Sequence, residues 1–208
     1  PITARLVADM IQVAGADRYM TIDLHAGQIQ GFFSIPGDVL TATYLLRDYI
    51  ATKQIENLVV VSTDLGYAKR GRNWAHNLNA PTAVIEKRRL STETKALTLI
   101  GEVEGRNVLL VDDEVDTAGS LLHAVELIDR EGAKGIYIAF THPVFSPPAQ
   151  ERLEQIHERA EEIVFTNTLP VPKAYLLPRM TVLSVAELLG EVIRRAHRGK
   201  SVGKMFNE

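Results

Sequence analysis

The chain has 208 residues, of which 46% are hydrophobic and 24% charged, and its formal net charge is −3. These values are typical of globular proteins and argue against a disordered chain, and there is no excess of positive charge for binding along a nucleic acid. The absence of cysteine excludes disulfides, zinc–thiolate sites and cysteine nucleophiles. No apolar run reaches the length of a membrane helix, and we expect a cytoplasmic protein without a membrane partner.

Short apolar segments rich in Val and Ile alternate with longer amphipathic segments. The expected strands are Tyr19–Asp23, Leu58–Ser62, Thr82–Glu86, Val108–Asp113, Gly135–Thr141, Ile163–Asn167 and Thr181–Ser184. The expected helices are Thr3–Ala14, Leu40–Ala51, Arg70–Leu78, Leu121–Glu131, Ala149–Arg159 and Val185–His197. Most of these strands lack strict polar–apolar alternation, which is typical of parallel strands covered on both faces. The alternation of strands and helices predicts an α/β fold with an open, mostly parallel twisted sheet and helices on both faces.

Ligands of such sheets bind beyond the carboxyl ends of the strands. The expected strand ends carry acidic, basic and small residues: Asp23 and His25, Asp64, Lys87 to Arg89, Asp112 to Ser120, and Thr141 with His142. We therefore expect the functional site among these residues.

The segment VLLVDDEVDTAGS, residues 108–120, combines an apolar strand, two carboxylates and a turn into a helix. The turn consists of Asp116, Thr117, Ala118, Gly119 and Ser120. Small residues allow the backbone to approach a ligand, and the first N–H groups of a helix favour a phosphate. Asp112 and Asp113 suit ribose hydroxyls or a metal-bound water. The structural alternative is a strand–turn–helix joint in which Asp116 is the N-cap.

Two strings carry a family resemblance. Residues 108–120 resemble the phosphoribosyl diphosphate loop of type I phosphoribosyltransferases and their relatives. The string DLHAGQIQGFFSIPGDVL, residues 23–40, closely resembles the DLHxxQIQGFFDIPVDxL segment of the ribose-phosphate pyrophosphokinases, which are also called phosphoribosyl pyrophosphate synthetases. Further similar strings, such as IEKRR at residues 85–89 and THPVFSPPAQERL at residues 141–153, extend the resemblance over the whole chain.

The resemblance implies transfer of the diphosphoryl group of ATP to ribose 5-phosphate, which gives phosphoribosyl diphosphate and AMP, with Mg²⁺ as the cofactor. By position it implies His25 and Asp64 as magnesium ligands and Lys87 and Arg89 as catalytic cations of a mobile loop. The implied ribose 5-phosphate ligands are Asp112, Asp113, Asp116, Thr117, Ala118, Gly119 and Ser120. A homo-oligomer, built from dimers up to a hexamer, is also implied.

The resemblance begins at the close of the family's N-terminal half. It predicts that residues 1–36 are the end of a truncated N-terminal domain and that residues 37–208 form a phosphoribosyltransferase-like domain. We therefore expect an incomplete ATP site and no full reaction by this polypeptide alone. Among the departures from the pattern, Ser34 replaces an acid, Tyr67 replaces a glycine, and the loop after Arg89 is one residue shorter.

Two alternatives stay open. The departures at Ser34, Tyr67 and the loop slightly favour a non-catalytic homologue that regulates active synthetase subunits. A phosphoribosyltransferase that consumes phosphoribosyl diphosphate would share the loop at residues 112–120. The strings DLHAGQIQGFF and IEKRR resemble the synthetases instead and argue against this second alternative.

Overall fold

The computed structural model describes residues 2–89 and 95–203, which form two compact units. Residues 2–42 and 187–203 make up the first unit, and the described residues between 43 and 186 make up the second. The domain boundary expected between residues 36 and 37 stays a prediction.

The first unit is a small assembly around two parallel strands. Its elements are α1 (Ile2–Val13), β1 (Tyr19–Ile22), the 3₁₀ helix η1 (Gly27–Phe32), β2 (Gly37–Leu40) and, apart from its first residue, α6 (Ala186–His197). Strands β1 and β2 pair in parallel, and the ring of Tyr19 stacks on that of Phe33 with centroids 3.9 Å apart.

The second unit is built on a seven-stranded sheet in the order β5-β4-β3-β6-β7-β8-β9. The strands are β3 (Leu58–Ser62), β4 (Thr82–Arg89), β5 (Lys95–Ile100), β6 (Asn107–Val115), β7 (Gly135–Pro143), β8 (Ala160–Thr166) and β9 (Met180–Leu183). Neighbouring strands are parallel except for β5, which runs antiparallel to β4 at one edge. The helical elements are α2 (Thr43–Thr52), α3 (Ala68–Asn77), α4 (Gly119–Arg130), α5 (Ala149–Arg159) and the 3₁₀ helix η2 (Lys173–Tyr175). No helix in the described part of the chain has the length and apolar character of a membrane span.

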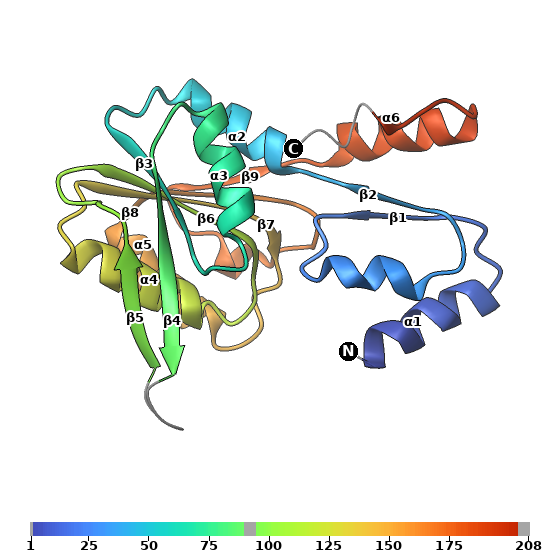
Figure 1. Cartoon of the computed structure of the whole chain (residues 1–208), viewed down its shortest axis with the longest axis horizontal. Coiled ribbons are helices and arrows are strands. Elements are labelled where there is room, and N and C mark those ends of the chain that lie inside the picture. Colours follow the sequence, from blue (N-terminus) through green and yellow to red (C-terminus); the bar gives the residue numbers. More distant parts are fainter. Residues whose placement is uncertain (1, 90–94, 204–208) are drawn as a thin grey trace. The chain divides into compact units, whose positions relative to one another are not determined.

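Helices cover both faces of this sheet (Figure 1). Helices α4 and α5 bury their apolar sides on one face, and α2 and α3 bury theirs on the other. The central strand β6 contributes alternate residues to the two cores: Val108 and Leu110 to the first, Leu109 and Val111 to the second. All four are fully buried, which explains the unbroken apolar run of this strand. The predicted α/β fold with an open, mostly parallel sheet is therefore confirmed.

Two expected elements have different bounds in the structure in ways that affect the site. The helix expected from Leu40 begins only at Thr43, because residues 37–40 form β2 and pair with β1. The strand expected to end at Glu86 continues to Arg89 and forms a hairpin pair with β5. Lys87 to Arg89 therefore lie within a strand and not beyond its end.

Candidate functional site

The turn between β6 and α4 has an unusual backbone. Ala118 is the N-cap of α4 with φ 57° and ψ 9°, in the left-handed region, and no side chain caps the helix. The alternative that Asp116 is the N-cap is therefore wrong. The left-handed conformation costs a non-glycine residue about 1–2 kcal/mol, so neighbouring groups must hold it.

Contacts from α5 and the segment before it hold this turn in place. Nη1 of Arg152 donates a hydrogen bond of 2.8 Å to the carbonyl oxygen of Thr117. The backbone N–H of Phe145 donates to the carbonyl oxygen of Val115 at 3.0 Å. The ring of Phe145 packs edge-on against Phe140 of the core, with centroids 6.0 Å apart. The turn is thus attached to the packed α4–α5 face of the sheet.

Asp112 is a half-buried carboxyl on β6 whose two oxygens both accept hydrogen bonds. The hydroxyl of Thr63 donates to Oδ2 at 2.6 Å, and the backbone N–H of Asp113 donates to Oδ1 at 2.9 Å. Burial, with smaller contributions from the charges of Asp113 and Asp64, raises the pKa of Asp112 to about 7, although the hydrogen bonds from Thr63 and from the Asp113 backbone act in the opposite direction. A carboxyl whose pKa is raised by burial and by neighbouring charges is a candidate for a functional site.

Thr63 was missed by sequence reasoning, although it directly follows β3 and precedes Asp64. Its side chain is 1% exposed and orients the Asp112 carboxyl. Its position next to a strand end was the available signal, but an uncharged threonine does not by itself indicate a ligand site.

Asp113 faces the opposite side of the sheet from Asp112. It is 4% exposed, and its Oδ2 lies 3.1 Å from Nη1 of Arg70 on α3. The carboxylate is therefore held by an ion pair, and its expected contact with ribose stays a prediction.

Tyr67 does not disturb the end of β3. Its φ of −87° is ordinary for any residue, and its backbone N–H donates to Oδ1 of Asp64 at 2.9 Å. Its ring is buried in the α2–α3 core, with the guanidinium carbon of Arg70 5.6 Å from the ring centroid. The backbone angle at this position therefore does not require a glycine.

His25 and Asp64, the expected magnesium ligands, belong to different units. His25 is exposed after β1, and Asp64 follows β3. Within residues 2–89 and 95–203, no three His, Asp or Glu side chains form a cluster that could hold a metal ion. Magnesium often takes only one or two carboxylates and fills its shell with water and phosphate oxygens, so this pair stays a prediction.

Other acidic residues of the first unit have structural partners. The buried carboxylate of Asp23 accepts a bond from the backbone N–H of Ala42 at 2.9 Å. Asp38 is paired with the guanidinium of Arg18 at 2.5 Å. These contacts link the ends of β1 and β2 to each other and to the segments beside them.

Lys87 and Arg89 are placed by their backbone alone. They pair with Leu97 and Lys95 of β5 in the antiparallel register. Their side chains and residues 90–94, where a loop was expected, lie outside the described part of the structure, so the catalytic role of Lys87 and Arg89 stays a prediction.

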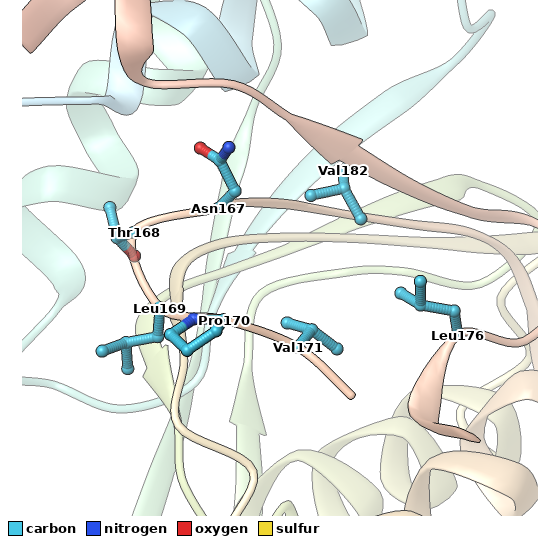
Figure 2. A pocket seen from close by; sticks show the side chains of 7 residues that line it. All are labelled: Asn167, Thr168, Leu169, Pro170, Val171, Leu176 and Val182. Carbon is cyan, nitrogen blue, oxygen red and sulfur yellow. The ribbon is translucent and has the colours of Figure 1, made fainter. Parts of the chain in front are cut away.

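A pocket of about 490 Å³ follows the end of β8 (Figure 2). Its lining residues are Asn167, Thr168, Leu169, Pro170, Val171, Leu176 and Val182. The lining contains no charged residue and is mostly apolar, so it does not suit a phosphorylated sugar. The hydroxyl of Thr168 lies 2.9 Å from Nδ1 of His142. None of the residues singled out for the site lines this pocket.

Gly71 allows α3 to lie close to the end of β3, since a Cβ at this position would collide with Oγ of Ser62. We expect Gly71→Ala to lower the free energy of unfolding by about 1–3 kcal/mol through overpacking. Adding Ser62→Ala should restore part of the loss. Gly190→Ala is the control, because its Cβ would meet open space on α6. Urea denaturation measures all four proteins, and a Gly71→Ala variant as stable as wild type would contradict the close approach.

Comparisons with known proteins agree on one family. Residues 88–207 match the family described as phosphoribosyl synthetase-associated domain. The ribose-phosphate pyrophosphokinase of Nostoc sp. is 47% identical over 207 residues, which cover 99% of this chain and 62% of that protein. The enzyme of the same name from Clostridium acetobutylicum is 44% identical over 211 residues, 100% of this chain and 66% of that protein.

A solved structure is also similar. The crystal structure of phosphoribosylpyrophosphate synthetase from Mycobacterium smegmatis matches with a TM-score of 0.88 and 42% identity. The match covers 96% of this chain and 65% of that chain. The chain thus spans less than two thirds of the length of these relatives.

Proposed function

Since this chain belongs to the ribose-phosphate pyrophosphokinase family, we propose that it is the ribose 5-phosphate-binding part of an enzyme that transfers the diphosphoryl group of ATP to that sugar phosphate. The observation that carries the proposal is the left-handed turn at Ala118, which connects β6, the strand that carries the Asp112 carboxyl, to the N-terminus of α4. A helix N-terminus favours a phosphate, and a carboxyl suits the sugar hydroxyls.

In the proposed reaction, the anomeric oxygen of ribose 5-phosphate forms a bond to the β-phosphorus of ATP. The bond from that phosphorus to the oxygen bridging to the α-phosphate breaks, AMP leaves with this oxygen, and the anomeric hydroxyl loses its proton. Such transfers depend on alignment and charge neutralisation more than on covalent catalysis.

Different residues of the chain would bind the 5-phosphate, contact the ribose hydroxyls and neutralise the diphosphate. The backbone N–H groups of residues 117–120 and the hydroxyls of Thr117 and Ser120 would bind the 5-phosphate. Asp112, oriented by Thr63, would accept hydrogen bonds from ribose hydroxyls. Lys87 and Arg89 would balance the charge of the transferred diphosphate.

Magnesium would neutralise the diphosphate oxygens when bound. The carboxylate of Asp64 fits the preference of this ion for oxygen ligands, whereas an imidazole such as His25 is a less usual ligand for it. The cytoplasmic location and the homo-oligomeric assembly stay predictions alongside this cofactor.

Calorimetric titration with ribose 5-phosphate tests the proposal. We expect the chain to bind it, and we expect Thr117→Ala to weaken the affinity about 5- to 20-fold, because one hydrogen bond to a charged phosphate is lost. Thr168→Ala is the matched control, since Thr168 lines the apolar pocket at the end of β8 and should leave the affinity unchanged.

No binding by the wild-type chain would refute the proposal. A loss of affinity in Thr168→Ala with none in Thr117→Ala would move the ligand to the pocket of Figure 2. AMP formation from ATP, Mg²⁺ and ribose 5-phosphate, measured on the same samples, separates binding from the complete reaction.

A further inference from the structure

The side chain of Arg152 on α5 lies against the turn between β6 and α4. Its Nη1 donates to the carbonyl oxygen of Thr117 at 2.8 Å, and a Cβ at Gly119 would lie only 3.0 Å from the same nitrogen. Building on the proposed function, we propose that Arg152 is a positioning residue that aims the main-chain amides of this turn at the 5-phosphate of ribose 5-phosphate.

The direction of the peptide group between Thr117 and Ala118 determines which of its polar atoms faces the phosphate site. The peptide bond between Thr117 and Ala118 is trans, and in a trans peptide the C=O and N–H groups point in opposite directions. The Thr117 carbonyl points toward the Arg152 guanidinium, so the Ala118 N–H points away from that group. If this peptide flipped, it would present a carbonyl oxygen where the phosphate is expected and repel it. The hydrogen bond from Arg152 disfavours that flip.

The turn needs such a constraint because Ala118 is in the left-handed region with φ 57°. A residue with a Cβ adopts this conformation reluctantly and keeps it only where its surroundings enforce it. A hydrogen bond from a guanidinium is charge-assisted and stronger than a neutral one.

Arg152 can act as a fixed reference because its helix is firmly packed. Ala149, Leu153 and Ile156 of α5 are at most 1% exposed and belong to the core that α4 also contributes to. The absence of a side chain at Gly119 leaves room for the guanidinium beside the turn. Its positive charge adds to the favourable potential of the α4 N-terminus for an anion.

Ligand titration of variants of the whole chain tests this role. Arg152→Met should weaken the affinity for ribose 5-phosphate about 10- to 100-fold, as expected for the loss of a hydrogen bond from a charged group. Arg152→Lys keeps the charge but lacks the planar fork and should give a smaller loss. Arg159→Met, on the same helix, is the control and should bind as wild type does, because its guanidinium is a surface group 3.4 Å from Asp129.

Amide NMR spectra provide a readout that a merely structural role would not give. Inorganic phosphate should shift the Ala118 and Gly119 signals of the wild-type chain, and Arg152→Met should reduce these shifts while the other signals keep their positions. General loss of signal dispersion in both Arg152 variants would show a structural role and overturn the inference.

The affinities of the Arg152 variants and of the wild-type chain test the positioning role and the proposed function separately. Wild-type affinity in Arg152→Met and Arg152→Lys would refute the positioning role and leave the proposed function standing. Failure of the wild-type chain to bind ribose 5-phosphate would remove the proposed function and this role with it. If Arg152→Met does not fold, the affinity and spectra of Arg152→Lys decide.

Discussion

Asp112→Asn should make the chain more stable than wild type at pH 8, by about 2–4 kcal/mol in the free energy of unfolding. Burial raises the pKa of Asp112 to about 7 in the folded chain, far above its ordinary value. Between about pH 4 and pH 7 the folded chain therefore binds more protons at this site than the unfolded chain does. The site's contribution to stability falls as the pH rises through this window, and an amide removes that fall.

The local structure tolerates the amide. The Asn carbonyl can accept the N–H of Asp113, and the hydroxyl of Thr63 can rotate to accept from the new NH₂ group. The difference in stability between variant and wild type should grow from near zero at about pH 4 to its largest value above pH 7. Urea denaturation at several pH values, in the presence of a metal chelator, measures it.

Asp129→Asn is the control for this series, because its carboxylate is an exposed group on α4 and should contribute little. Equal stability of Asp112→Asn and wild type at pH 8 would contradict the raised pKa.

We also expect Asp112→Asn to bind ribose 5-phosphate more weakly, since the proposed hydrogen bonds to the sugar hydroxyls lose a charged acceptor. A gain in stability with a loss of binding is the usual trade-off of a functional site.

Trp74→Ala should lower the free energy of unfolding by about 3–5 kcal/mol, the usual cost of emptying a large core position. Trp74 lies on α3, is 1% exposed and packs in the core with Leu46, Ile50 and Tyr67. Helix α3 also carries Arg70, which pairs with Asp113 near the end of β6. The substitution should therefore also weaken this ion pair and make the end of β6 less ordered.

Trp74→Phe is the matched variant for this prediction. It keeps much of the ring volume and removes an indole N–H that has no hydrogen-bond partner within residues 2–89 and 95–203. Its cost should therefore stay within about 1–2 kcal/mol. Trp74 is the only tryptophan of the chain, so circular dichroism must follow unfolding in place of fluorescence. A cost in Trp74→Phe as large as in Trp74→Ala would contradict this account.

The sheet of the second unit was predictable from sequence because its central strands are buried on both faces. Residues 108–111 of β6 form an apolar run that no exposed strand would need, and each neighbouring helix shows its own apolar stripe. Strand β5 was missed for a different reason. Leu97 and Leu99 pack against the core at a period of two, but residues 95–97 belong to the segment after Arg89 that resembles a flexible loop.

The candidate site was predictable as a set of residues and unpredictable as a set of contacts. The turn at residues 116–120 was located by its small residues and the preceding carboxylates. The partners that fix it, Arg70 and Arg152, are distant in sequence, and their pairing with Asp113 and Thr117 depends on how the helices pack. Propensity and spacing carry no information on such tertiary contacts.

Arg70 and Arg152 connect the turn between β6 and α4 to the two hydrophobic cores, so defects in either core can affect ligand binding. Arg70 lies on a helix that covers one face of the sheet, and Arg152 lies on a helix that covers the other. The segment from Asp113 to Thr117 is therefore tethered from both layers. A substitution that disturbs the packing of either hydrophobic layer should weaken the affinity for the ligand before the whole chain unfolds. Ligand affinity should therefore respond to core defects more strongly than the melting temperature does.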